Sequence, residues 1–167
     1  MKTLAAIFAL ARGLASPSFA AAKDWGGFEV EALKNHPDGK PVVMLNLIKF
    51  RAKSLDGNGT GLDAYTRYTA VAIPMTLQRG GKTIWLGKVD HSVLNQGSDV
   101  NWDVAFVVEY PSRAAFIDMV THKDYRKANL DRENGVEKQI VLANTTAGIS
   151  MVQSQPATPG TGATTAP

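Results

Sequence analysis

The three histidines, His36, His91 and His122, are the first residues to consider for acid–base chemistry, because the imidazole pKa lies near neutral pH. No two of them share a spacing that would place them on one helix face, so we expect no metal site. His122 lies three residues before Tyr125 in an expected helix, where the two could form an acid–base pair. The simpler interpretation is a partly exposed helical histidine.

Polar residues inside apolar strands are informative, because burying an unpaired amide or charge is costly. Asn46 shares one strand face with Met44 and Ile48. It would either orient a ligand carbonyl or satisfy a backbone group at a strand irregularity. Lys49 and Arg51 lie at the end of the same strand and could hold a carboxylate together with Arg132. The alternative for these three cations is a solvated surface.

Aromatic residues are expected to fill the layer between sheet and helices, and most of them to be core. They are Tyr65, Tyr68, Trp85, Phe106, Tyr110, Phe116 and Tyr125. A buried phenol needs a hydrogen-bond partner, which makes Tyr68 and Tyr125 candidate pocket groups. The catalytic candidates are therefore Tyr125, His122 and Tyr68. The predicted ligand-binding set is Asn46, Tyr65, Tyr68, Trp85, Tyr125 and Arg132.

The segment 56–61 imitates the first half of a calcium loop, with oxygen-bearing residues at its first, third and fifth positions and glycine at its sixth. The twelfth position is Arg67 instead of glutamate, which favours a flexible polar loop. The chain has no cysteine, no phosphate-binding glycine loop, no dinucleotide fingerprint and no nucleophile elbow. We therefore expect neither a metal nor a cofactor.

Residues 1–22 have the layout of a secretory signal peptide: Lys2, an apolar run, and small residues at Ser18 and Ala20. Cleavage would follow Ala20 or Ala22. The alternative is an amphipathic N-terminal helix, which the charge of Arg12 supports. The apolar run is shorter than the ~20 residues of a membrane span, so we expect no permanent membrane anchor.

Residues 150–167 carry no charge and are rich in Pro, Gly and Thr, which predicts a disordered tail; the alternative is a surface tether. Residues 23–149 then form one globular domain of the 167-residue chain. Without Lys2 and Arg12 the formal charge falls from +3 to +1, so no nucleic-acid partner is expected.

The hydrophobic pattern of that domain predicts the order β-α-β-β-α-β. We expect strands at 41–50, 83–89, 102–110 and 139–143, and helices at 61–79 and from 112 to about 134. A capping box of Thr60 and Asp63 begins the first helix, Pro74 kinks or breaks it, and Gly80-Gly81 ends it. This order gives an α+β fold with one four-stranded antiparallel sheet and both helices on one face.

The first and third strands are apolar on both faces, yet helices can cover only one face of the sheet. A second copy of the chain would bury the other face and close a barrel with twofold symmetry. The alternative is an open face that stays half wet. The pattern therefore favours a homodimer.

The stretch from Tyr65 to Ala143 resembles the family called domain of unknown function 1330, in the dimeric α/β-barrel superfamily. The matching features are Tyr65, Tyr68, Gly80-Gly81, Gly87, the junction 109–112, Tyr125 and Arg132. Leu86 departs from the pattern, because the family usually has an arginine before that glycine. The resemblance implies a ferredoxin-like protomer, a homodimer and a pocket between sheet and helices, and it implies no reaction.

Two functions follow from these observations. The first is an exported bacterial protein, periplasmic or secreted, whose homodimer binds a small aromatic or carboxylate-bearing molecule between sheet and helices. The superfamily that the chain resembles includes cofactor-independent oxygenases and isomerases, and such a protein could share an activity of that kind. The second is a non-catalytic interaction or scaffold protein of the cell envelope.

Overall fold

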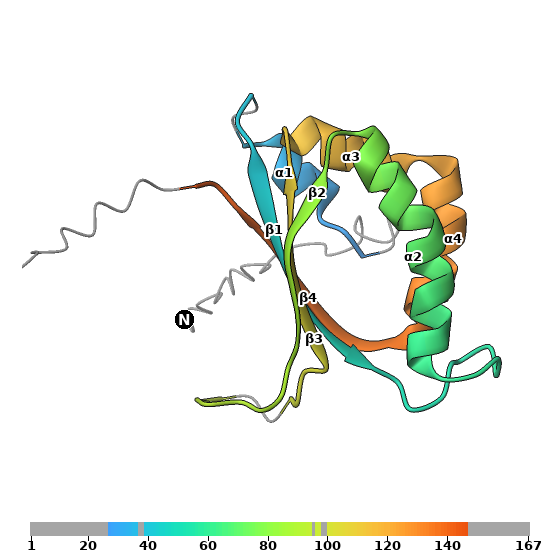
Figure 1. Cartoon of the computed structure of the whole chain (residues 1–167). Coiled ribbons are helices and arrows are strands. Elements are labelled where there is room, and N and C mark those ends of the chain that lie inside the picture. The colour runs from blue at the N-terminus through green and yellow to red at the C-terminus, as the bar shows by residue number, and fades with distance from the viewer. Residues whose placement is uncertain (1–26, 37–38, 95, 98–99, 147–167) are drawn as a thin grey trace, which may run out of the picture.

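The computed structural model describes residues 27–36, 39–94, 96–97 and 100–146 (Figure 1). The predicted signal peptide (1–22) and the predicted tail (150–167) lie outside the described residues. Within the described ranges, no helix is both long enough and apolar enough to cross a membrane.

The described chain forms one four-stranded antiparallel sheet with its three longer helices on one face (Figure 1). The elements are α1 (Val30–Lys34), β1 (Val42–Phe50), α2 (Gly61–Gln78), β2 (Lys82–Lys88), β3 (Val104–Tyr110), α3 (Arg113–Thr121), α4 (Lys123–Gly135) and β4 (Val136–Asn144). The strand order is β2-β3-β1-β4. The predicted ferredoxin-like α+β fold is confirmed, and the short helix α1 is an addition that the sequence pattern did not predict.

The central strand β1 is apolar on both faces, as its sequence indicates. Met44, Asn46 and Ile48 are buried on the helix side. Leu45 and Leu47 point to the opposite face, where they pair with Val107 and Ala105 of β3 and with Leu142 and Ile140 of β4. The described helices leave this second face open (Figure 1).

Helix α2 begins and ends as predicted. The Thr60 hydroxyl accepts a hydrogen bond from the Asp63 amide, and the Asp63 carboxylate accepts one from the Thr60 amide at 2.8 Å. Gly80, with φ of 73°, follows the helix in the left-handed conformation that glycine adopts readily. The helix does not break at Pro74. Proline has no backbone N–H, so the Ala70 carbonyl loses its helical hydrogen bond. This loss is tolerated because both residues lie on the exposed side of α2.

The second predicted helix is in fact two helices, α3 and α4, separated at His122. The ψ angle of His122 is 140°, which is extended backbone, and its Nδ1 accepts a hydrogen bond from the Asp124 amide at 3.2 Å. The imidazole thereby serves as the N-cap of α4. The prediction of one continuous helix with His122 inside it was wrong.

The edge strand β2 contains a bulge between Thr83 and Trp85 that changes which side chains face the helices. Thr83 pairs with Val108 and Leu86 with Phe106, on the helix side, whereas Trp85 pairs with Val107 on the open face. Trp85 is 52% exposed, and its ring covers Gly87. The prediction that Trp85 lines the layer between sheet and helices was therefore wrong, because regular alternation takes no account of a bulge.

Helices α2 and α4 meet at two glycines beside the end of β1. The Gly61 amide donates to the Arg51 carbonyl at 3.0 Å, and the Arg51 amide donates to the Gly135 carbonyl at 2.9 Å. A Cβ atom on Gly61 would lie 2.5 Å from the Arg51 carbonyl oxygen, so only glycine fits. This backbone contact sets how closely the helical layer approaches the sheet at that end.

Candidate ligand-binding site

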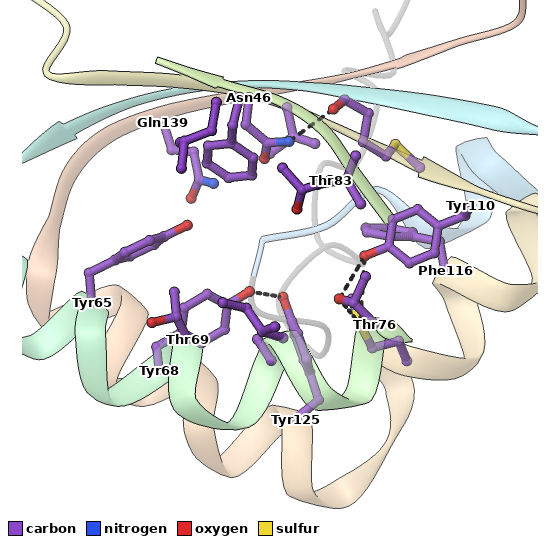
Figure 2. Close-up of a pocket in the computed structure, with 18 of the residues that line it drawn as sticks. Asn46, Tyr65, Tyr68, Thr69, Thr76, Thr83, Tyr110, Phe116, Tyr125 and Gln139 are labelled. Carbon is purple, nitrogen blue, oxygen red and sulfur yellow. Dashed lines mark hydrogen bonds between the residues drawn. The ribbon is translucent and has the colours of Figure 1, made fainter. Parts of the chain in front are cut away.

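A cavity of about 230 Å³ lies between the helix side of the sheet and helices α2, α3 and α4 (Figure 2). Its walls are mostly apolar, with Met44, Phe106 and Val108 from the sheet. Ile73 and Leu77 of α2 also border it and are exposed. With the exposed Leu86 of β2, they form an apolar rim between α2 and the edge strand.

All four tyrosines of the chain line this cavity: Tyr65, Tyr68, Tyr110 and Tyr125. The Tyr68 and Tyr125 hydroxyls share a hydrogen bond of 2.7 Å, with their ring centroids 5.8 Å apart. The Tyr110 hydroxyl lies 3.2 Å from Thr76 Oγ1. Tyr65 stacks at a tilt 5.2 Å from Tyr68, and its hydroxyl points into the cavity (Figure 2). A buried phenol was expected to need a hydrogen-bond partner, and for Tyr68 that partner is Tyr125.

Burial keeps these phenols protonated. Desolvation raises the pKa of Tyr110 to about 12, and it raises the pKa of Tyr65, Tyr68 and Tyr125 as well. For Tyr125, the neighbouring Tyr68 raises the pKa further. At neutral pH the four phenols therefore act as hydrogen-bond donors and acceptors, and none is a phenolate base.

Two amides, Asn46 of β1 and Gln139 of β4, supply polar groups on the sheet side of the cavity. Asn46 Nδ2 donates to the Met44 carbonyl at 3.1 Å, so the amide satisfies a backbone group as one of the two interpretations expected. Gln139 Oε1 accepts a hydrogen bond from Arg132 Nη1. In Figure 2 the Gln139 amide and the Tyr65 hydroxyl point toward one another, with Asn46 beside them.

Arg132 does not border this cavity, but it donates a hydrogen bond to Gln139, which does. Its guanidinium is buried between α4 and the sheet, donates from Nε to Asn129 Oδ1 at 2.5 Å, and lies 5.0 Å above the centre of the Phe28 ring. Lys49 is on the opposite face of the sheet, in an ion pair with Asp103 at 2.9 Å. The structure therefore does not assemble the predicted carboxylate site of Lys49, Arg51 and Arg132.

His122 and Trp85, two further predicted site residues, lie outside the cavity. The His122 side chain is 40% exposed, with Nδ1 3.7 Å from Asp124 Oδ2. Because His122 is not helical, the three-residue spacing does not pair its imidazole with Tyr125. Asn46, Tyr65, Tyr68 and Tyr125 are all brought together around the cavity.

Sequence reasoning missed several lining residues, namely Phe28, Thr69, Thr76, Thr83 and Gln139. The sequence could have indicated Gln139, because it is a polar residue in an apolar strand, like Asn46. Thr76 and Thr83 had no such signal, since threonine is common on both exposed and buried faces. Phe28 lies before the first predicted element, so no periodicity marked it.

The calcium-like loop is held by the arginine at its twelfth position. Arg67 Nη2 donates to Asp56 Oδ2 at 2.5 Å, and Arg67 Nε donates to Asp131 of α4 at 2.9 Å. The Ser54 hydroxyl and the Asn58 amide also donate to Asp56, and these bonds and Arg67 lower its pKa. The described part of the chain contains no group of three acidic, histidine or cysteine side chains that could hold a metal ion.

Comparison with solved structures places this architecture among known proteins. A crystal structure of a protein of unknown function from Rhodopseudomonas palustris is 33% identical, with a TM-score of 0.65, over 71% of this chain and 92% of that one. The chain belongs to the same family as the Rhodopseudomonas palustris protein. A methylated form of that family member is 32% identical over 73% of this chain and 93% of its own, again with a TM-score of 0.65.

A more distant similarity, at 15% identity and a TM-score of 0.43, is to a dimeric protein of unknown function with a ferredoxin-like fold from Bacteroides fragilis, over 64% of this chain and 96% of that one. No protein-family model and no curated protein matches the chain. Membership of the domain of unknown function 1330 family therefore stays a prediction. Leu86, which stands where that family usually has an arginine, lines the cavity, so this position contributes no positive charge here.

The phenols provide a direct test of the site, because every tyrosine of the chain borders the cavity. We expect ultraviolet titration to show no phenolate below about pH 11, compared with about 10 for an unperturbed phenol. Because the unfolded chain loses phenol protons above about pH 10 while the folded chain keeps them, the free energy of unfolding should fall as pH rises further. A tyrosine that ionises near pH 10 in the folded protein would contradict this account of the cavity.

Proposed function

We propose that this protein binds a small, mainly apolar molecule, preferably aromatic, in the cavity between sheet and helices. One observation carries the proposal: the Tyr65 hydroxyl and the Gln139 amide converge at one end of a mostly apolar space. Ligand sites typically combine apolar walls with a few polar groups that fix orientation. The volume of about 230 Å³ is below the range of about 300–1,000 Å³ for drug-sized ligands, which favours a small molecule.

The polar groups at that end suit an oxygen atom of the ligand. The Tyr65 phenol is protonated, because burial raises its pKa, and it can donate to a carbonyl or hydroxyl oxygen. Gln139 already accepts from Arg132 at Oε1, which orients its NH₂ group as a second donor. A ligand with one carbonyl or hydroxyl group on an aromatic body matches this arrangement.

The same residues favour binding over base catalysis. Among the described residues that line the cavity, the titratable side chains are the four tyrosines, whose pKa values are all raised. An isomerase-like or oxygenase-like activity would therefore depend on hydrogen bonding and proton donation by Tyr65. The Tyr68 and Tyr125 hydroxyls bind each other, which leaves them a supporting role.

Two threonines one turn apart on α2 give a matched test. Thr69 borders the cavity and Thr66 faces solvent, and each hydroxyl donates to a backbone carbonyl of its own helix. Thr69→Phe should fill the cavity and weaken binding of a neutral aromatic probe such as 4-phenylbutanamide at least about tenfold in calorimetry. Thr66→Phe should leave the affinity unchanged.

Absence of heat and of thermal stabilisation with a panel of aromatic amides, ketones and phenols would contradict ligand binding. The remaining function would then be the alternative expected from the sequence, a non-catalytic interaction or scaffold protein. Equal loss of affinity in the Thr66 and Thr69 variants would instead place the probe outside this cavity.

We further propose that two copies associate through the open face of the sheet. Leu45, Leu47, Val107, Ile140 and Leu142 lie on this face, and Ile140 and Leu142 are exposed. Charges of both signs border it, in the pairs Lys82–Glu109 and Lys49–Asp103. An apolar centre with a rim of mixed charge suits a self-complementary twofold contact.

Light scattering should therefore give twice the mass of one chain. Leu45→Asp, which puts a charge at the centre of the open face, should shift the protein to monomer. Leu130→Asp is the control, because Leu130 lies on α4 and is already 60% exposed. A monomeric wild-type protein would refute association through the sheet.

Export is the final part of the proposal, and it rests on the layout of residues 1–22. Mass spectrometry of the protein recovered from a bacterial periplasm or culture medium should find a mature N-terminus after Ala20 or Ala22. Recovery of the intact chain from the cytoplasm alone would contradict export.

A further inference from the structure

A second cavity, of about 350 Å³, lies beside the first, between α1, α3 and the strands β1 and β4. The two cavities share five lining residues: Phe28, Met44, Phe116, Gln139 and Val141. The Phe28 ring lies at the shared boundary, 5.6 Å from the Phe116 centroid and 6.3 Å from that of Tyr125. A molecule longer than the first cavity therefore meets the second along Phe28 and Gln139.

The second cavity differs from the first in charge. Two buried arginines line it, Arg113 at 4% exposure and Arg132 at 9%. Glu29 is the acidic residue among its described lining, and Glu29 is exposed to solvent, which screens its charge. The first cavity is lined by neutral groups, so the positive potential increases from one cavity to the next.

A hydrogen bond joins lining residues of the two cavities. Arg132 donates from Nη1 to Gln139 Oε1, and Gln139 borders both cavities. Arg113 Nη2 donates to the Thr145 hydroxyl at 2.7 Å, which holds its side chain at the wall formed by α3. Guanidinium groups recognise carboxylates through paired N–H donors, and the interaction is strongest where water is excluded.

Resting on the proposed binding function, we propose that the ligand is an amphipathic carboxylate that occupies both cavities. Its apolar body lies among the tyrosines, and its carboxylate lies in the second cavity near Arg132 and Arg113. The ligand spans the boundary at Phe28, whose ring already packs against the Arg132 guanidinium. This assigns the carboxylate to Arg113 and Arg132, in place of the cluster of Lys49, Arg51 and Arg132 that the sequence suggested.

The first experiment uses the unaltered full chain and a pair of probes of nearly equal size, 4-phenylbutyrate and 4-phenylbutanamide. Calorimetry should show that the carboxylate binds about tenfold to a hundredfold more tightly than the amide, the range expected for hydrogen bonds to a buried charged group. Equal affinities would overturn the inference and leave the proposed aromatic site intact. Binding of neither probe would remove the proposed function together with the inference.

The second experiment locates the carboxylate. Arg113→Gln should reduce the affinity for 4-phenylbutyrate about tenfold and leave that for 4-phenylbutanamide unchanged, because Arg113 borders the second cavity and does not border the first. Arg79→Gln is the matched control, since Arg79 pairs with Asp118 at the surface and lines neither cavity. Unchanged carboxylate affinity in a folded Arg113→Gln protein would overturn the placement. If that variant does not fold, the probe pair on the unaltered chain still decides.

Discussion

The hydrogen bond between the Tyr68 and Tyr125 hydroxyls determines which polar groups the cavity offers. It joins α2 to α4 in a region where a hydroxyl without a partner would cost about 1–3 kcal/mol. One phenol donates and the other accepts, so both oxygens are engaged, while the accepting phenol keeps one O–H that it can still donate. Tyr110 pairs with the Thr76 hydroxyl, and the Met119 sulfur lies within reach of both as an acceptor. Tyr65, whose hydroxyl points into the cavity and takes no part in these pairs, is the phenol best placed to interact with the proposed ligand.

Arg132 has the corresponding role on the other side of the cavity. By donating to Gln139 Oε1 it holds that amide in place at the cavity wall, and through the Phe28 ring it also supports the boundary with the second cavity. An arginine is costly to bury, and here its planar fork reaches Asn129 and Gln139 at once. One buried cation thus orients a neutral hydrogen-bond donor in one cavity and supplies positive potential to the next.

Much of the fold was predictable because burial imposes regular spacing. The alternation in β1 placed Asn46 with Met44 and Ile48, and the capping box placed the start of α2, both as observed. The errors come from local irregularities that periodicity does not encode. One bulge moved Trp85 to the open face, and the N-cap at His122 divided the predicted second helix. The pairing of Arg132 with Gln139, and the insertion of Phe28, depend on tertiary contacts that residue spacing alone does not specify.

The two faces of β1 connect the proposed ligand site with the proposed dimer. Alternate residues point to opposite sides, so Asn46 borders the cavity while Leu45 and Leu47 lie on the open face. A shift of register by one residue would exchange these sets and bury the leucines where the cavity is. In the observed register, Asn46 pairs with Phe106 of β3 and Val141 of β4, which keeps it on the cavity side. Because the apolar rim formed by Ile73, Leu77 and Leu86 lies on the helix side, a second copy on the open face would leave that rim uncovered.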